Sequence, residues 1–337
     1  MNTTSLPAVT PPPPTPGPPG RLLVSEITDK AKVRGIFLVS RKVVASDKNG
    51  KCYLSLLLSD RSGQIDARVF DNAAELAEVF DEQDHVRVAG TAKSFQGRLQ
   101  LHLQKIERAP EEEIDPGDYV PVSRRDSDDM WTELQAILDT LADPDIARLL
   151  RALFDDPDVA ARFRRAPAAK SIHHAWIGGL LEHNLSVHRV IVGLCDHYEH
   201  ETPGLVDRDL CIAGGLLHDF GKIYELSTDA GAIEYTHEGQ LIGHLVQCSQ
   251  KLAEVAATLP GFPRDRLTAL QHIVLAHHDR LEFGSPKRPM TAEAMVVHAA
   301  DQLDSRLAYL QQLRGRESGG WSSYQKVFDR PFFLPRR

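Results

Sequence analysis

GLLHDFGK, residues 215–222, ends an apolar run with His218 and Asp219 side by side. The preceding residues have the apolar spacing of a buried helix, for which Asp207 is a suitable N-cap. We expect Gly221 to end this helix in the left-handed conformation. An imidazole and a carboxylate at the end of an apolar helix have two interpretations. Either the helix ends in solvent with polar residues, or the two side chains form part of a metal site. The rest of the chain decides between these interpretations.

The histidines indicate where the remainder of such a site lies. Of the 15 histidines, 13 follow residue 170, where apolar residues recur every three or four positions. Several histidines and aspartates fall on the apolar faces or at the ends of five predicted helices. They are His183, His218, Asp219, His244, His277, His278, Asp301 and Asp304. Buried polar groups need partners, and this mixture of imidazole and carboxylate suits Mn²⁺, Fe, Co, Ni or Zn.

For two of these helices the sequence predicts which residues share the buried face. The pattern over 173–194 places Trp176 and His183 on one buried face, and that over 236–259 does the same for Leu241 and His244. The glycine pairs 178–179 and 214–215 would let neighbouring helices approach closely.

The order of these residues resembles the HD-domain metal-dependent phosphohydrolases over roughly residues 165–312. In this resemblance the HD signature corresponds to His183, His218, Asp219 and Asp301. The additional residues His244, His277 and His278 resemble those that hold a second metal in the HD-GYP branch. The stretch HDFGK matches the HD-x-GK form, which implies that Lys222 lies near the substrate phosphate.

The first third of the chain has a different period. Residues 30–108 alternate as strands do, for example at Ile65, Ala67 and Val69, and a short helical pattern occupies 72–80. Five strands with one helix between the third and fourth are typical of an OB-fold barrel. Residues 21–108 hold 15 Lys and Arg against 12 Asp and Glu, a weak basic excess on an acidic chain of net charge −8. Such an excess is compatible with a polyanion-binding module.

Single strands bind through stacked aromatic rings and basic side chains. The candidate nucleic-acid contacts in the barrel are Phe37, Tyr53, Lys93, Phe95 and Arg98. Phe95 and Arg98 flank a predicted hairpin tip, where an aromatic residue is unexpected. Phe37 and Tyr53 also fit core positions.

We therefore predict a multidomain chain, an all-β OB-fold barrel followed by an all-α HD-type helical bundle. The predicted boundaries are 1–20 for a disordered proline-rich tail, 21–108 for the barrel, 109–127 for a linker, 128–315 for the bundle and 316–337 for a C-terminal extension. The chain shows no signal-peptide pattern and no apolar stretch long enough to span a membrane. Cys52, Cys195, Cys211 and Cys248 are far apart and indicate reduced thiols, so we expect a cytoplasmic protein.

Over residues 21–330 the chain resembles the YhaM-type 3′→5′ exoribonucleases. The motifs that carry this resemblance include HHAWIGGLLEHNLSV, LLHDFGKIYEL, YTHEGQLIGH, LAHHDRLEFGSPKRP and HAADQLDSRL. The family implies Mn²⁺-dependent removal of nucleotides from the 3′ end of single-stranded RNA, with some action on single-stranded DNA. Asp219 would then be a ligand placed to bridge two ions, and Lys222 would neutralise charge on the phosphate.

Other functions fit parts of the pattern. The histidines also suit an HD-type cyclic-dinucleotide phosphodiesterase or a nucleotide phosphodiesterase, although residues after His278 lack a GYP tripeptide. A nucleic-acid-binding protein without catalytic activity is the alternative of another class. The sequence leaves open the number and identity of the ions, the preference for RNA or DNA, and whether the chain forms a homo-oligomer.

Overall fold

A computed structural model of the 337-residue chain describes residues 22–46, 50–95, 98–170, 174–228, 231–316 and 319–335. The chain divides into two compact units, residues 1–124 with 229–232 and residues 125–228 with 233–337. Each unit has its own apolar core. The predicted tail at 1–20 lies outside the described residues, and the domain boundaries stay predictions. Among the described helices, none has the length and apolar character needed to cross a membrane.

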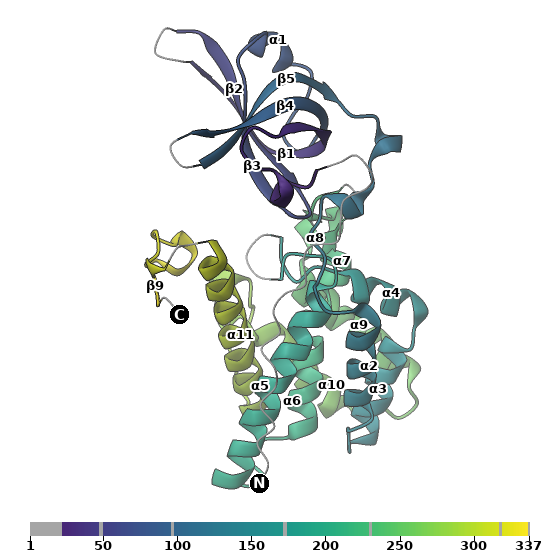
Figure 1. The fold of residues 1–337 in the computed structure, drawn as a ribbon. Coiled ribbons are helices and arrows are strands. Elements are labelled where there is room, and N and C mark those ends of the chain that lie inside the picture. The colour runs from purple at the N-terminus through teal and green to yellow at the C-terminus, as the bar shows by residue number, and fades with distance from the viewer. Residues whose placement is uncertain are drawn as a thin grey trace. The chain divides into compact units, whose positions relative to one another are not determined.

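The first unit contains a closed five-stranded barrel (Figure 1). Its elements are β1 (Lys32–Ser46), β2 (Cys52–Asp60), β3 (Gly63–Val69), α1 (Ala73–Leu76), β4 (His85–Phe95) and β5 (Arg98–Arg108). The strands pair in the order β1-β2-β3-β5-β4, and β4 closes the barrel on β1. Among the described strand pairs of the barrel, only that of β3 with β5 is parallel. The predicted OB-fold, with its helix between the third and fourth strands, is confirmed.

The barrel core follows the alternation in the sequence. Ile65, Ala67 and Val69 all point inward from β3 and are buried. Phe37 on β1 lies in the same core with 0% of its surface exposed. Its ring therefore has no free face on which a base could stack, and the nucleic-acid contact predicted for Phe37 is corrected to a core position.

The second unit is helical, apart from two short hairpins. Its helices are α2 (Ser127–Leu138), α3 (Pro144–Phe154), α4 (Pro157–Arg165), α5 (Gly179–Glu201), α6 (Arg208–Leu217), α7 (Lys222–Glu225), α8 (His237–Leu241), α9 (His244–Thr258), α10 (Arg264–Ala276) and α11 (Ala292–Arg316). Strand β6 (Leu226–Ser227) pairs with β7 (Glu234–Tyr235), and β8 (Gly320–Trp321) pairs with β9 (Phe333–Leu334). Helices α5, α6 and α11 lie side by side around the apolar core (Figure 1). The predicted N-cap Asp207 accepts hydrogen bonds from the backbone N–H groups of the first turn of α6.

Two predicted helices differ from the observed ones. The pattern over 236–259 forms α8 and α9 instead of one helix, because Gly243 adopts a φ of +79° between them. Leu241 is consequently 72% exposed, and the prediction that it is buried is wrong. Trp176 precedes α5, which begins at Gly179. The break at Gly243 makes His244 the first residue of a new helix.

The glycines near these helix ends act through close contacts. Gly214 and Gly215 would each place a Cβ within 2.7 Å of an isoleucine side chain of a neighbouring helix, so the predicted close approach is confirmed there. Gly179 instead packs against the carbonyl oxygen of His174. Gly221 has a φ of −60°, and the left-handed conformation predicted for it is wrong. Its constraint is the carbonyl oxygen of His244, which would lie 2.0 Å from a Cβ at that position.

Candidate metal centre

Three helices of the second unit bring a first group of ligands together. His183 comes from α5, His218 follows the last residue of α6, and Asp301 comes from α11. The Nε2 atom of His183 lies 3.3 Å from Nε2 of His218 and 3.2 Å from Oδ1 of Asp301. Ligand atoms about 2.1 Å from one ion lie about 3.0–3.4 Å apart in octahedral or tetrahedral geometry. The two distances from His183 fall within this range, and the third, 3.7 Å between Nε2 of His218 and Oδ1 of Asp301, is slightly longer. Small movements of the side chains would allow all three atoms to bind a common ion.

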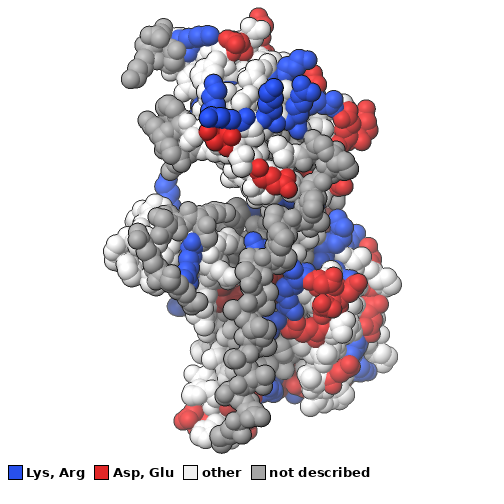
Figure 2. All heavy atoms as spheres, viewed as in Figure 1, with Lys and Arg blue, Asp and Glu red and all other residues white. Residues whose placement is uncertain are grey.

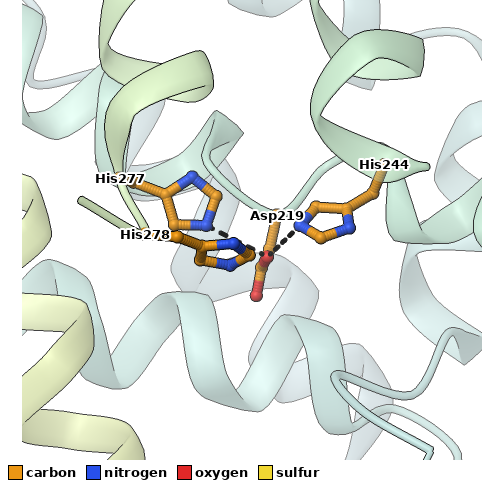
Figure 3. A group of neighbouring side chains, drawn as sticks. All are labelled: Asp219, His244, His277 and His278. Carbon is orange, nitrogen blue, oxygen red and sulfur yellow. Dashed lines mark ion pairs between the residues drawn. The ribbon is translucent and has the colours of Figure 1, made fainter. Parts of the chain in front are cut away.

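A second group consists of Asp219 with His244, His277 and His278 (Figure 3). His244 begins α9, and His277 and His278 follow the last residue of α10. Oδ1 of Asp219 lies 3.4 Å from Nε2 of His244 and 3.6 Å from Nε2 of His277. His278 also contributes a ligand atom to this group, in which all such atoms lie within 4.8 Å of one another.

Asp219 contacts both groups with different oxygens. Its Oδ1 faces His244 and His277, whereas its Oδ2 lies 3.4 Å from Nε2 of His218. Lys222 also binds Oδ2, at 2.7 Å, and donates to the carbonyl oxygen of Ala168 at 2.6 Å. The carboxylate therefore stands between the two histidine groups with one oxygen directed to each.

All five imidazoles are oriented in the same way. Each has its Nδ1 within hydrogen-bond distance of an oxygen outside the centre. The partners are Asp304 for His183 at 3.0 Å, Gly215 for His218 at 2.8 Å, Glu225 for His244 at 2.9 Å, Val274 for His277 at 2.8 Å and Phe283 for His278 at 2.7 Å. Donation from Nδ1 to these oxygens leaves the Nε2 lone pair free to face the centre, as in metal-binding histidines.

Several buried atoms of the centre lack hydrogen bonds. Among the residues that the structure describes, none forms a hydrogen bond with Oδ1 of Asp219, Nε2 of His244 or Nε2 of His277. Leaving buried polar atoms unpaired is costly, so such atoms indicate a missing partner. A divalent cation would satisfy all three, and nitrogen and carboxylate donors without sulfur suit Mn²⁺, Fe, Co, Ni or Zn. The residues present therefore fit a bound metal ion.

The surroundings of Asp219, His277 and His278 favour the protonation states in which these side chains can bind a metal ion. Burial raises the pKa of Asp219, but Lys222 and His218 outweigh it and hold that pKa well below its usual range. Burial lowers the pKa values of His277 and His278, so both rings are neutral at pH 7. An ionised carboxylate and neutral imidazoles are the forms that bind metal ions.

His183 is the exception among the ligands. Burial lowers its pKa, but hydrogen bonds to Asp301 and Asp304 outweigh this effect and raise the pKa to about 9. The ring therefore carries a proton at neutral pH in the absence of an ion. A cation that binds Nε2 must displace this proton.

The sequence pattern gave Asp304 no supporting role at the site and did not identify Glu225. Asp304 has the spacing of an inward-facing acid, and the structure shows that it supports His183. Glu225 accepts from both Nδ1 and the backbone N–H of His244. No local pattern marks Glu225, because its partner is 19 residues away and belongs to another helix.

The barrel has a separate aromatic and basic surface. Tyr53 and Phe70 lie 5.8 Å apart between ring centroids, and Phe70 lies 5.5 Å from His102. The guanidinium of Arg68 stands 6.0 Å from the Tyr53 ring. Burial and then the charges of Lys93 and Arg68 lower the pKa of His102. We call Tyr53, Arg68, Phe70, Lys93 and His102 the barrel surface cluster.

This cluster contains two of the predicted contacts. Tyr53 is half-buried and Lys93 is exposed. The side chains of the predicted contacts Phe95 and Arg98 lie outside the described residues. Phe70, 41% exposed just after β3, was missed, although the alternation that points Val69 inward would turn the next residue outward. Figure 2 shows basic side chains on the visible face of the barrel with acidic ones among them, in line with the small basic excess.

Comparison with known proteins assigns both units. Residues 180–306 match the family model of the HD domain, and residues 32–109 match that of an OB-fold nucleic acid binding domain. The HD match includes every ligand of both groups.

Solved structures that are similar to part of this chain include the following two proteins. The second OB-fold domain of replication protein A from Methanococcus maripaludis is 20% identical, with 27% of this chain and 96% of that chain covered and a TM-score of 0.23. A mitochondrial single-stranded DNA binding protein from S. cerevisiae is 21% identical, with 24% and 95% covered and a TM-score of 0.22.

The chain thus combines an N-terminal OB-fold nucleic-acid-binding domain with a C-terminal HD domain. The HD domain and its histidine and aspartate cluster indicate a metal-dependent phosphohydrolase. Together with the OB-fold, they support a hydrolase that acts on nucleic acid.

Proposed function

We propose that this protein is a metal-dependent 3′→5′ exoribonuclease that hydrolyses single-stranded RNA, and also single-stranded DNA, with Mn²⁺ as its ion. The observation that carries the proposal is the position of Asp219 between two histidine groups, in a chain that also has an OB-fold. The direction of degradation and the choice of Mn²⁺ come from the resemblance of the motifs to YhaM-type exoribonucleases. The buried free thiols suit a reducing compartment, and we propose that the enzyme acts in the cytoplasm.

Each ligand has a role in this proposal. His183, His218 and Asp301 would hold one ion, His244, His277 and His278 would hold another, and Asp219 would contribute one oxygen to each. Bound ions would supply Lewis-acid chemistry that polarises a phosphoryl oxygen and makes a water molecule more acidic. Lys222 places its ammonium beside Asp219, where it would neutralise charge that develops on the phosphate.

The barrel would supply affinity for the strand. Bases stack on exposed aromatic rings while cations contact the phosphates. The barrel surface cluster offers Phe70 and Tyr53 for stacking and Lys93 for phosphate contact. Its residues lie on β2, on and just after β3, and on β4 and β5, and strands 2 and 3 form the usual binding face of OB-folds.

The test is a time course with 5′-labelled single-stranded RNA and Mn²⁺. Wild type should produce a ladder that shortens from the 3′ end, and the double variant His218→Ala, Asp219→Ala should leave the RNA intact. RNA that wild type binds but does not cleave, with small phosphodiesters also intact, would support the non-catalytic alternative. Intact RNA with hydrolysis of cyclic dinucleotides or nucleotides would support a small-substrate phosphodiesterase.

A further inference from the structure

The segment that follows His278 is attached to this histidine by three hydrogen bonds. The Nδ1 atom of His278 lies 2.7 Å from the carbonyl oxygen of Phe283, and its backbone N–H donates to Oγ of Ser285 at 3.1 Å. The backbone N–H of Arg280 donates back to the carbonyl oxygen of His278 at 2.9 Å. Ser285 is itself buried, with 1% of its surface exposed. These contacts hold residues 279–285 against a ligand of the metal centre.

Large apolar side chains of this segment nevertheless face solvent. Phe283 is 60% exposed and Leu281 is 81% exposed, both within the short 3₁₀ helix Leu281–Phe283. The contact with His278 uses only the backbone carbonyl of Phe283, so any side chain at 283 would preserve it. An exposed aromatic ring is not needed for the fold at this position. Single exposed apolar residues are common on proteins, and it is the location beside a metal ligand that gives this ring significance.

Cations accompany the ring. Arg280 pairs with Glu282 and Arg288 pairs with Asp279, whereas exposed Lys287 forms no ion pair within the described part of the chain. An exposed aromatic ring and an unpaired cation four positions away in the same segment are the residue types that bind single-stranded nucleic acid. A strand whose phosphate reaches the centre would bring a base and a neighbouring phosphate close to this segment.

We propose that Phe283 is a base-stacking residue of the active centre, whose exposed ring packs against the nucleobase next to the scissile phosphate. This inference rests on the proposed nucleic-acid hydrolysis and adds a substrate contact within the HD domain itself. The centre would therefore recognise a nucleotide with its base and would favour RNA over phosphodiesters that lack one.

The first experiment measures stacking without turnover. Single-stranded RNA with 2-aminopurine as its 3′-terminal base is bound to the full-length protein in EDTA. Wild type and Phe283→Trp should quench the fluorescence, and Phe283→Leu should lose most of the quenching. Phe333→Leu is the matched control, because Phe333 is similarly exposed at 58% but lies in the C-terminal hairpin. Equal quenching by Phe283→Leu and wild type, or no quenching by wild type, would overturn the inference.

The second experiment measures substrate selectivity with Mn²⁺. For Phe283→Leu, the ratio of kcat/KM for RNA to kcat/KM for bis(p-nitrophenyl) phosphate should fall about tenfold or more. Phe283→Trp should restore the ratio, and Phe333→Leu should leave it at the wild-type value. An unchanged ratio while wild type still shortens RNA would reject the stacking role alone. RNA left intact by wild type would reject the proposed function, and the quenching would then show separately whether the base binds.

Discussion

Glu225 binds His244 twice, accepting from its Nδ1 at 2.9 Å and from its backbone N–H at 3.1 Å through the same oxygen. The first contact sets the tautomer of the ring, and the second satisfies a free N–H at the start of α9. One carboxylate therefore orients the ring and anchors the helix that carries it.

Replacing Glu225 should weaken metal binding at one group more than at the other. We expect Glu225→Ala to reduce the affinity for the ion held by His244, His277 and His278 by about 10- to 100-fold, because the ring loses its orienting partner. Glu225→Gln retains an acceptor and should lose less. Calorimetric titration with Mn²⁺ measures the two binding steps, one for the ion at each histidine group. Asp304→Ala is the complementary variant, since Asp304 supports His183, and it should weaken the other step. Equal losses at both steps would contradict two separate groups.

Lys222 should affect turnover more than metal binding. Lys222→Met removes the ammonium beside Asp219, and we expect kcat on RNA to fall about 100-fold, because charge on the phosphate is no longer neutralised. Affinity for Mn²⁺ should not fall, since a positive charge next to the ligand is lost. Steady-state kinetics combined with metal titration separate the two effects. A variant that loses its ion along with its activity would show that Lys222 acts by supporting the ligands.

Gly221 should tolerate no side chain. A Cβ there would lie 2.0 Å from the carbonyl oxygen of His244, so Gly221→Ala should destabilise the metal-free protein by about 2 kcal/mol or more and displace that ligand. Gly193→Ala is the matched control. Gly193 lies within α5, and a Cβ there would meet no described atom within 4 Å beyond its chain neighbours and the backbone of its own helix. Alanine there should stabilise the helix by about 0.5–1 kcal/mol. Thermal unfolding in EDTA measures whether Gly221→Ala destabilises the protein and whether Gly193→Ala stabilises it. A Gly221→Ala protein as stable as wild type would show that the start of α9 can move to make room for the side chain.

Metal affinity should rise with pH. The folded-state pKa of His183 is raised from 6.5 to about 9, and the ion must displace this proton. Affinity at the first group should therefore increase about tenfold per pH unit between 7 and 9 and then level off. In metal-free protein the same proton stabilises the fold below pH 6.5, and this contribution is lost as the pH rises through about 9. Mn²⁺ titrations at pH 7, 8 and 9 measure how steeply the affinity rises with pH. Asp304→Asn removes an anion beside His183, so it should lower the pKa of this histidine and make the rise less steep. A pH-independent affinity would contradict the protonated state.

The barrel surface cluster should determine affinity for long RNA. Phe70→Ala should cost about 1–3 kcal/mol of binding free energy, because one stacking platform is lost. Lys93→Ala should weaken binding and reduce the salt dependence by about one phosphate contact. Val79→Ala, at a similarly exposed position after α1, is the control. Anisotropy with labelled RNA in EDTA gives these values, and an effect of Val79→Ala equal to that of Phe70→Ala would argue against the cluster.

Local patterns predicted much of both units. The alternation at Ile65, Ala67 and Val69 indicated a buried strand face, and the apolar spacing around His183 and His218 indicated buried helices. These predictions succeeded because period and burial are expressed within a few residues of chain. The errors at Leu241 and Gly221 arose where the backbone departs from a continuous helix, at Gly243 and between α6 and α7.

The sequence by itself determined the barrel, the helical bundle and the set of residue types able to bind a metal ion. It did so because strand and helix periods and the chemistry of His and Asp are local properties. Only the tertiary structure decided which oxygen of Asp219 faces which histidines, and that Glu225 and Asp304 orient two of the rings. These relations join residues up to 121 positions apart, and they depend on how separate helices pack. The same packing placed Phe37 in the core and left Phe283 exposed beside a ligand.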